Sequence, residues 1–295
     1  MFDERMIIIQ WINVNLKSLL KQSKFMNNKK LWIVFFLFVG IGFLWSQPKI
    51  VSWNIQNFGQ SKSDSAVQYM AKKLRDYDVV AIQEVVAGKG GAQAVAKLAD
   101  YLNRSGAKWD YRISNPTSGN PYKSERYAFL WKTKSIKLVG KPWLDTFYES
   151  RIEREPFLAT FEFEKKQFTI VNFHALPKKD QPETEIKYFK NYLTHYPDLE
   201  LIFLGDFNCP SAHSVFLPLK KLGYASAFEG QKTSLKNKAT NGNFLASEYD
   251  TILLSSTFEI KQCEVIHFHD DFKVFKSARR ISDHLPVYVE LVWRE

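Results

Sequence analysis

Short apolar runs that alternate with amphipathic segments constrain the fold of this chain more than any other feature. The runs VVAI (79–82) and LIFL (201–204) are apolar at every position, which is typical of strands covered on both faces. Strands are predicted at KIVSW (49–53), DVVAIQ (78–83), YAFLW (127–131), FTIVNF (168–173), LIFLGD (201–206), YDTILL (249–254) and PVYVELVW (286–293). Helical spacing of apolar residues occurs at 65–77, 90–106, 182–196 and 211–224. The alternation predicts an α/β layered domain.

The composition indicates one folded domain with a basic surface. The 295 residues are 45% hydrophobic and 15% aromatic, which excludes a disordered chain. Lys and Arg number 41 against 31 Asp and Glu, a net charge of +10 that favours a polyanionic partner such as nucleic acid or an anionic membrane. The stretch 230–247, rich in Lys, Asn, Gly and Ser, is predicted to be one long surface loop.

The N-terminal part has the pattern of a secretory signal. Lys29 and Lys30 precede the apolar run at 31–45, and Ser46 supplies a small residue behind it. About 15 residues with a rise of ~1.5 Å each fall short of a hydrocarbon core about 30 Å thick. Cleavage is therefore favoured over the alternative, an uncleaved membrane anchor at 31–45.

These observations give a domain plan. We expect an N-terminal extension and signal peptide at 1–47, with Met26 as an alternative start, and a single catalytic domain at 48–295. The mature protein is then secreted or periplasmic. In that setting Cys209 and Cys263 form either one disulfide or two free thiols.

Polar side chains recur at the predicted strand ends, where α/β proteins usually gather their ligands. Each has an ordinary explanation when taken alone, such as a turn cap, an ion pair or a satisfied core histidine. Together they supply carboxylate and amide oxygens, which suit Mg²⁺ or Mn²⁺ and do not suit zinc. The residues concerned are Asn54, Glu84, His174, Asp206, Asn208, Asp250, Asp283 and His284.

Two further motifs contain unusual polar residues. ERYAFLW (125–131) begins a half-buried strand with Glu125, and a buried carboxylate is rare unless it has a partner. HFHDD (267–271) offers imidazoles and carboxylates, but no matching ligand spacing occurs elsewhere in the chain. We expect a polar loop at 267–271 rather than a transition-metal site.

Eight motifs, in this order, resemble the endonuclease/exonuclease/phosphatase superfamily, with the greatest similarity to its deoxyribonuclease I branch. They are SWNIQNFG, AIQEV, SERYAFLW, EREP, NFHALP, GDFN, YDTIL and SDHLPV, and the resemblance extends over 49–293. It implies a four-layer α/β/β/α sandwich with two packed central β-sheets. It also implies a monomeric endonuclease that hydrolyses DNA with little sequence specificity and with the help of Mg²⁺ or Mn²⁺, and it leaves room for a structural Ca²⁺.

The resemblance further implies roles for particular residues. Glu125 pairs with His174 and Asp250 pairs with His284, since a carboxylate fixes the orientation of an imidazole that moves protons. We expect His284 to be the base and His174 the acid, although the sequence alone leaves that direction open. Glu84 holds the cation, with Asn54, Asp206 and Asp283 close by.

Residues that contact the substrate are predicted as well. Arg154 resembles a phosphate-binding arginine, and its alternative is a salt bridge to Glu153 or Glu155. Asn208 either orients phosphate or water, or stabilises the turn before Pro210. Tyr122 corresponds to a tyrosine that lies against the DNA minor groove. Lysines near these segments, namely Lys123, Lys232, Lys236 and Lys238, either contact phosphates or form a solvated surface.

Other functions remain open at this stage. The same fold could serve a phosphatase or a phospholipid phosphodiesterase of the sphingomyelin type. A non-catalytic nucleic-acid-binding module is less favoured, because both acid–imidazole pairs and the whole oxygen set are present.

Overall fold

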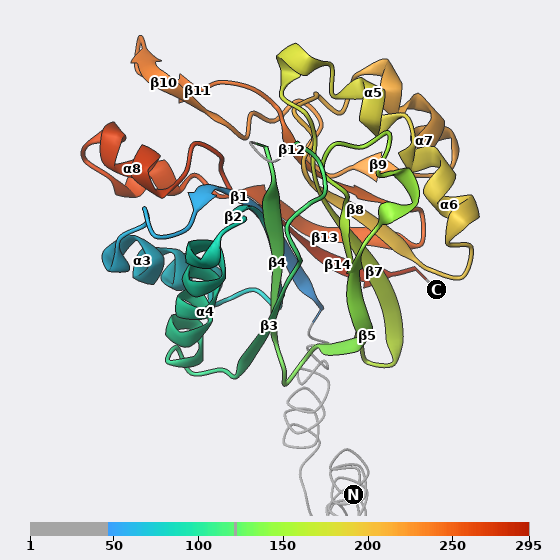
Figure 1. Ribbon diagram of the computed structural model, residues 1–295, viewed down its shortest axis with the longest axis horizontal. Helices are drawn as coiled ribbons and strands as arrows, with labels where there is room; N and C mark the ends of the chain where they lie inside the picture. Colours follow the sequence, from blue (N-terminus) through green and yellow to red (C-terminus); the bar gives the residue numbers. More distant parts are fainter. Residues whose placement is uncertain (1–46, 121–122, 295) are drawn as a thin grey trace, which may run out of the picture. The chain divides into compact units, whose positions relative to one another are not determined.

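Two six-stranded β-sheets packed face to face form the centre of the protein in the computed structural model, which describes residues 47–120 and 123–294 (Figure 1). The first sheet has the order β13–β14–β1–β2–β4–β3, with β1 Lys49–Phe58, β2 Val79–Val86, β3 Trp109–Ile113, β4 Glu125–Lys132, β13 Phe258–Val265 and β14 Val287–Trp293. The second has the order β5–β6–β7–β8–β12–β9, with β5 Lys137–Leu144, β6 Phe157–Phe163, β7 Lys166–His174, β8 Leu201–Asp206, β9 Ala225–Ser226 and β12 Asp250–Leu254. Strands β1 and β2 face β7, β8 and β12 of the other sheet.

Helices cover the outer face of each sheet, which completes the predicted four-layer sandwich (Figure 1). On the first sheet they are α3 Asp64–Leu74, α4 Lys89–Asn103 and α8 Phe275–Ile281, and on the second α5 Glu183–Ile186, α6 Tyr192–His195 and α7 Leu217–Lys221. Strand β8 is buried throughout: Leu201 and Phe203 pack against the helices, whereas Ile202 and Leu204 belong to the core between the sheets. The two-sided apolar run therefore fills two cores at once.

Strand direction brings the predicted polar residues to one edge of the sandwich. In the first sheet β1 and β2 are parallel, and in the second β7 and β8 are parallel, so each pair has its carboxyl ends at one edge of its sheet. The contact between Asn54 and Asp206 shows that these two edges adjoin. β12 runs antiparallel to β8 and begins with Asp250 opposite Asp206. β4 runs antiparallel to β2 and begins with Glu125 opposite Val86.

The predicted strands and the helices α3 and α4 are confirmed, but two predicted helices are wrong as continuous elements. The segment 182–196 is broken into α5, a 3₁₀ turn at Phe189–Asn191 and α6. Ile186, Phe189 and Tyr192 are buried at intervals of three residues, and 3₁₀ turns place such residues on one side. The segment 211–224 is helical only at Ser214–Phe216 and in α7, where Pro218 occupies the first turn.

The loop predicted at 230–247 is also corrected, because it contains a two-stranded hairpin. Strands β10 Leu235–Thr240 and β11 Asn243–Leu245 pair with each other and with neither central sheet. Strands β3, β5, β6, β9 and β13 are further elements that the sequence did not reveal. Several of them lie at sheet edges, where polar residues, Gly140 and Pro142 mask the apolar pattern.

Both cysteines are free thiols, so the disulfide alternative is wrong. Cys209 is buried against the helices of the second sheet, and the Cys263 thiol lies 3.5 Å from the Ala227 carbonyl oxygen. The predicted signal peptide lies outside the described residues and stays a prediction. Across 47–120 and 123–294, no helix has the length and apolar character needed to cross a membrane.

Gly205, which precedes Asp206 in β8, allows β7 and β8 to approach closely. A Cβ atom there would lie 1.9 Å from the Phe173 carbonyl oxygen, and the φ angle of +135° is one that other residues rarely adopt. We expect Gly205→Ala to lower the free energy of unfolding by about 3 kcal/mol or more, because backbone must move. Urea denaturation measures this. In Gly140→Ala, where φ is +70° and the space is open, the loss should be about 1–2 kcal/mol, and equal losses would contradict the close-approach argument.

Candidate active site

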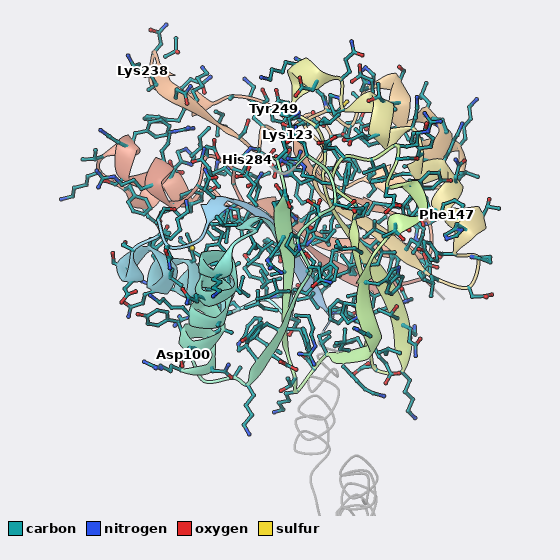
Figure 2. All side chains as sticks on the ribbon, viewed as in Figure 1. Asp100, Lys123, Phe147, Lys238, Tyr249 and His284 are labelled. Atoms are coloured by element: carbon teal, nitrogen blue, oxygen red, sulfur yellow. The ribbon has the colours of Figure 1, made fainter. Side chains whose placement is uncertain are left out.

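A pocket of about 560 Å³ opens at the edge where these strand ends meet. Figure 2 labels His284 and Lys123 at this end of the sandwich. The pocket is lined by Asn57, Glu84, Val85, Val86, Ala87, Gly88, Lys123, Ser124, Glu125, Arg154, His174, Pro177, Lys179, Asp180, Asp206, Asn208 and His284. The lining thus contains seven of the predicted catalytic, metal-binding and substrate-binding residues, together with Lys123 from the predicted phosphate-contacting lysines.

Glu125 at the start of β4 holds His174 at the end of β7. The imidazole Nδ1 lies 3.0 and 2.9 Å from the two carboxylate oxygens of Glu125, and both side chains are buried. Arg154 Nη1 lies 3.6 Å from Glu125 Oε2. The expected pair is therefore formed, and the carboxylate that opens the ERY motif has two partners.

Asp250 at the start of β12 holds His284 in the same way. His284 Nδ1 lies 2.7 Å from Asp250 Oδ2, and Asp250 is 1% exposed. Thr233 Oγ1 donates to the same oxygen at 2.7 Å and accepts from the Asp250 backbone N–H at 2.8 Å. A carboxylate that is fixed from both sides leaves its imidazole one orientation.

The two histidines converge on Asp206. The Nε2 atom of His174 and the Nε2 atom of His284 each lie 3.5 Å from Asp206 Oδ2. Both imidazoles therefore bind an acid through Nδ1 and present Nε2 to one point of the pocket. Groups so arranged can accept and donate a proton on opposite sides of a reacting centre.

The oxygen atoms beside Asp206 fit a hard divalent cation. Asn54 Nδ2 donates to Glu84 Oε1 at 3.0 Å and to Asp206 Oδ2 at 2.9 Å, which brings two carboxylates together. Asn54 Oδ1 is buried and, among the described residues, has no hydrogen-bond partner. An unpaired buried oxygen beside two carboxylates suits Mg²⁺ or Mn²⁺.

The backbone is strained where it presents Glu84. This residue has a φ angle of +58°, and it lies within irregular pairing of β2 with both neighbours. Its Oε2 accepts from the Asn57 N–H at 3.0 Å, and Asn57 also has a positive φ. Such outliers concentrate at functional sites, because the surrounding structure must hold them in place.

Asp283 has different contacts from those of this oxygen group. Its Oδ2 accepts from Gln56 Nε2 at 2.8 Å and lies 3.6 Å from Arg279 Nη2, and it is not among the residues that line the pocket. Its Oδ1 is buried without a partner in the described part of the chain. Hydrogen bonds of Asn54 thus join Glu84 and Asp206, whereas the contacts of Asp283 lead to Gln56 and Arg279, and its predicted role at the cation stays a prediction.

Arg154 and Asn208 both reach the pocket, with partners that differ from those expected. Arg154 donates from Nε to the His174 carbonyl oxygen at 3.0 Å and from Nη2 to that of Ala175, so the salt bridge to Glu153 or Glu155 is wrong. Asn208 donates from Nδ2 to Ala175 O at 3.2 Å and from its backbone N–H to Asp206 Oδ1 at 2.9 Å. Tyr122 lies outside the described residues.

The surroundings of the two histidines have opposite effects on their pKa values. Burial lowers the pKa of His174 to about 4, and the neighbouring Arg154 cation acts in the same direction. Burial also disfavours the charged form of His284, but the Asp250 and Asp206 carboxylates outweigh it and raise the pKa well above the usual value. Burial raises the pKa of Glu125 to about 7 against the effect of Arg154. The carboxylates near His284 thus favour its protonated form, whereas the surroundings of His174 favour the neutral form.

Sequence patterns did not reveal two residues near the site. Thr233 lies in the stretch predicted as a loop, and nothing in its neighbours indicates the contact with Asp250. Lys62 donates to the Ile281 carbonyl oxygen at 2.8 Å, and burial lowers its pKa to about 8 despite the carboxylates of Asp283 and Glu84. A lysine in a surface turn carries no signal of such a position.

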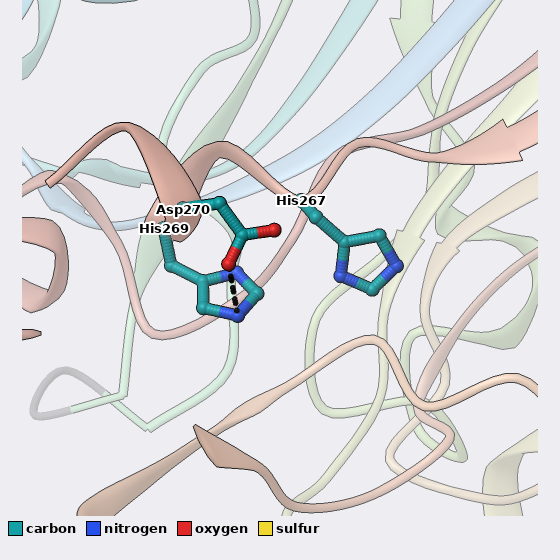
Figure 3. A group of neighbouring side chains, drawn as sticks. All are labelled: His267, His269 and Asp270. Carbon is teal, nitrogen blue, oxygen red and sulfur yellow. Dashed lines mark ion pairs between the residues drawn. The ribbon is translucent and has the colours of Figure 1, made fainter. Parts of the chain in front are cut away.

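The HFHDD segment forms a 3₁₀ helix, Phe268–Asp271, rather than the expected loop (Figure 3). His267, His269 and Asp270 have ligand atoms within 4.8 Å of one another, and His269 Nε2 pairs with Asp270 Oδ1 at 3.4 Å. Within 47–120 and 123–294, no fourth His, Cys, Asp or Glu joins the group. Three ligands, two of them exposed, fall short of the four that a structural zinc site takes.

Known proteins share this sequence pattern and fold. Residues 51–284 match the Endonuclease/Exonuclease/phosphatase family. Deoxyribonuclease-1 from Bos taurus is 30% identical over 264 residues, which cover 82% of this chain and 92% of the bovine protein. A deoxyribonuclease from Thioalkalivibrio sp. (strain K90mix) is 29% identical over 267 residues, 82% of this chain and 70% of that protein. A family protein of known structure from Bacteroides thetaiotaomicron superposes with a TM-score of 0.63 at 19% identity, over 84% of this chain and 98% of that one.

The histidine environments lead to a prediction about titration. We expect the His284 imidazole to titrate at higher pH than the His174 imidazole in metal-free protein, since carboxylates surround the first and Arg154 adjoins the second. NMR of the ring signals across pH measures both pKa values.

Asp250→Asn should lower the His284 pKa. Because His284 binds its proton more tightly when folded, the stability lost in this variant should be greatest below about pH 6.5 and shrink as pH rises. A higher pKa for His174 would contradict the charge argument.

Proposed function

Because this chain belongs to the endonuclease/exonuclease/phosphatase family, we propose that it is a deoxyribonuclease I-like endonuclease that hydrolyses DNA with the help of a divalent cation and with little sequence specificity. The family and the deoxyribonuclease relatives make the chain a hydrolase of the nuclease and phosphatase class. The observation that carries the narrower proposal is the pair of carboxylate-held histidines whose Nε2 atoms meet at Asp206.

The charges around each histidine support a particular part for it in the proposed reaction. Arg154 lies beside the Glu125–His174 pair, so His174 stays neutral and its Nε2 accepts the proton of the attacking water. His284 lies between Asp250 and Asp206, so it stays protonated and its Nε2 donates to the leaving oxygen. This direction reverses the one expected from sequence. Glu125 and Asp250 hold the Nδ1 atoms and keep each ring oriented.

The remaining pocket residues bind and orient the phosphate. Glu84, Asp206 and Asn54 Oδ1 would hold the cation, which when bound neutralises charge on the scissile phosphate. Arg154 brings a fixed positive charge to the wall of the pocket. Asn208 lies next to Asp206 with its amide directed at Ala175 O, so it positions the segment after β7 as well as facing the substrate. Among the described residues of the pocket, no further feature favours a phosphatase or a lipid enzyme.

Glu84→Gln tests the cation site. The loss of one carboxylate charge should lower the rate of plasmid nicking about 100-fold and raise the Mg²⁺ concentration needed for half of the maximal rate. EDTA should abolish nicking, and Mg²⁺ or Mn²⁺ should restore it. The matched control is Glu259→Gln on the exposed side of β13, which should nick at the wild-type rate. Full activity of the wild-type protein in EDTA would refute the proposed chemistry.

Glu125→Gln and His174→Ala test whether this pair acts as one unit. Each should lower the nicking rate by roughly 10²- to 10⁴-fold, and the double variant should be little slower than the worse single variant. Circular dichroism should show that all three remain folded. If Glu125 were merely structural, Glu125→Gln would lose stability but retain nicking, or the two losses would multiply in the double variant.

A further inference from the structure

We propose that the β10–β11 hairpin and helix α8 form a cationic arm that binds the phosphate backbone of duplex DNA beyond the scissile phosphate. This inference rests on the proposed function, and it resolves the alternatives for the lysines at 232–238. The two elements lie next to each other at the end of the sandwich that carries the site (Figure 1).

The arm has many positive charges and few negative ones. Between 231 and 247 the chain has three lysines and no Asp or Glu, and between 273 and 281 it has two lysines and two arginines, again without an acid. Lys238, Lys273, Lys276 and Arg280 are exposed. Within the described parts of the chain, the ammonium groups of Lys236 and Lys238 form no ion pair. Unpaired lysines on one surface can exchange their counterions for DNA phosphates.

Hydrogen bonds tie the base of the hairpin to both halves of the second acid–imidazole pair. Thr233 Oγ1 donates to Asp250 Oδ2 at 2.7 Å, and Ser234 forms a β-bridge with His284. Leu235 N–H donates to the Asp283 carbonyl oxygen at 2.7 Å. The hairpin therefore begins beside Asp250 and His284, and these hydrogen bonds fix its direction relative to the two sheets. DNA that lies on it would pass across the pocket.

Contacts with α8 hold the hairpin along its length. Arg279 donates from Nη1 to the carbonyl oxygens of Leu235 and Lys236, at 2.8 and 3.2 Å, and from Nη2 to Asn237 Oδ1 at 2.9 Å. The rings of Phe244 and Phe275 pack with their centroids 4.5 Å apart. Arg279 is thus used internally, and the charge accessible to a ligand is that of the exposed side chains such as Lys238, Lys276 and Arg280.

The charges of the arm lie outside the pocket, which indicates an extended ligand. No residue of the hairpin is among those that line the pocket within the described chain. In Figure 2, Lys238 lies at the far end of the hairpin, and Lys123 lies on the other side of His284 in this view. A small phosphoester would occupy the pocket alone, whereas a duplex can reach both. An anionic membrane is disfavoured, because Val274 is the single large apolar side chain that the described residues of the arm expose.

The test compares two double variants with equal charge change. Lys236→Gln/Lys238→Gln removes two positive charges from the arm. Lys134→Gln/Lys165→Gln removes two from the turns that follow β4 and β6, at the end of the sheets away from the site. Binding to a 30-base-pair duplex is measured in EDTA by fluorescence anisotropy across a range of salt. The arm variant should bind at least tenfold more weakly, and its slope of log K against log salt should fall by roughly 0.9 for each lysine. The control should behave as the wild type.

The outcomes separate the arm from the proposed function. The arm variant should nick plasmid with a raised KM and a nearly unchanged kcat, because the pocket is intact. If both variants bind the duplex as the wild type does, the arm is overturned while the nuclease can stand. If the wild type neither binds nor nicks DNA, the proposed function falls as well. If the arm variant loses binding to vesicles with anionic lipid but retains binding to DNA, the ligand is a membrane and the proposal is overturned.

Discussion

Two carboxylates from different sheets meet at the amide of Asn54, and the rest of the site depends on this contact. Asn54 lies on β1 and Glu84 on β2 of one sheet, whereas Asp206 ends β8 of the other. One amide nitrogen donates to both acids, at 3.0 and 2.9 Å. Like charges held so close repel each other unless positive charge is added, so the sandwich creates a place for a cation by the way its sheets are joined.

A buried polar network just below the site fixes how the sheets lie against each other. Gln83 Nε2 donates to Asn172 Oδ1 at 2.6 Å and to Ser52 Oγ at 3.1 Å, and Asn172 Nδ2 donates to the Ile82 carbonyl oxygen at 3.2 Å. An apolar core tolerates small shifts, whereas hydrogen bonds between fully buried groups do not. Gln83 directly precedes Glu84 in the chain, and Asn172 lies two residues before His174. The network therefore sets the distance between groups that arrive from separate sheets.

The sequence predicted the parts of this arrangement that depend on strand ends, and missed the parts that depend on long-range contacts. Strand polarity alone brings Asn54, Glu84, His174 and Asp206 to one edge, so their proximity follows from apolar patterning. The partner of Arg154 could not be found in this way, because Glu125 is near it only after β4 and β6 take their places. The helix expected at 182–196 breaks because burial every third residue overrides helical propensity. The hairpin was hidden because polar residues fill a ribbon that pairs only with itself.

The distribution of charge in the pocket accounts for the different surroundings of the two histidines and is consistent with the proposed cation. Four acids, namely Glu84, Glu125, Asp206 and Asp250, surround the reacting centre, and the Arg154 cation lies 3.6 Å from one of them, Glu125. That position leaves the Glu125–His174 side nearly neutral, so His174 need not hold a proton. The Asp206–Asp250 side has no such cation beside it, and its carboxylates favour the protonated form of His284. Glu84 accepts hydrogen bonds from Asn54 and from the Asn57 N–H, and an incoming phosphate would add negative charge beside it. A cation held by Glu84 would supply positive charge for both carboxylate and phosphate, so the proposed chemistry depends on Glu84 more than the fold does.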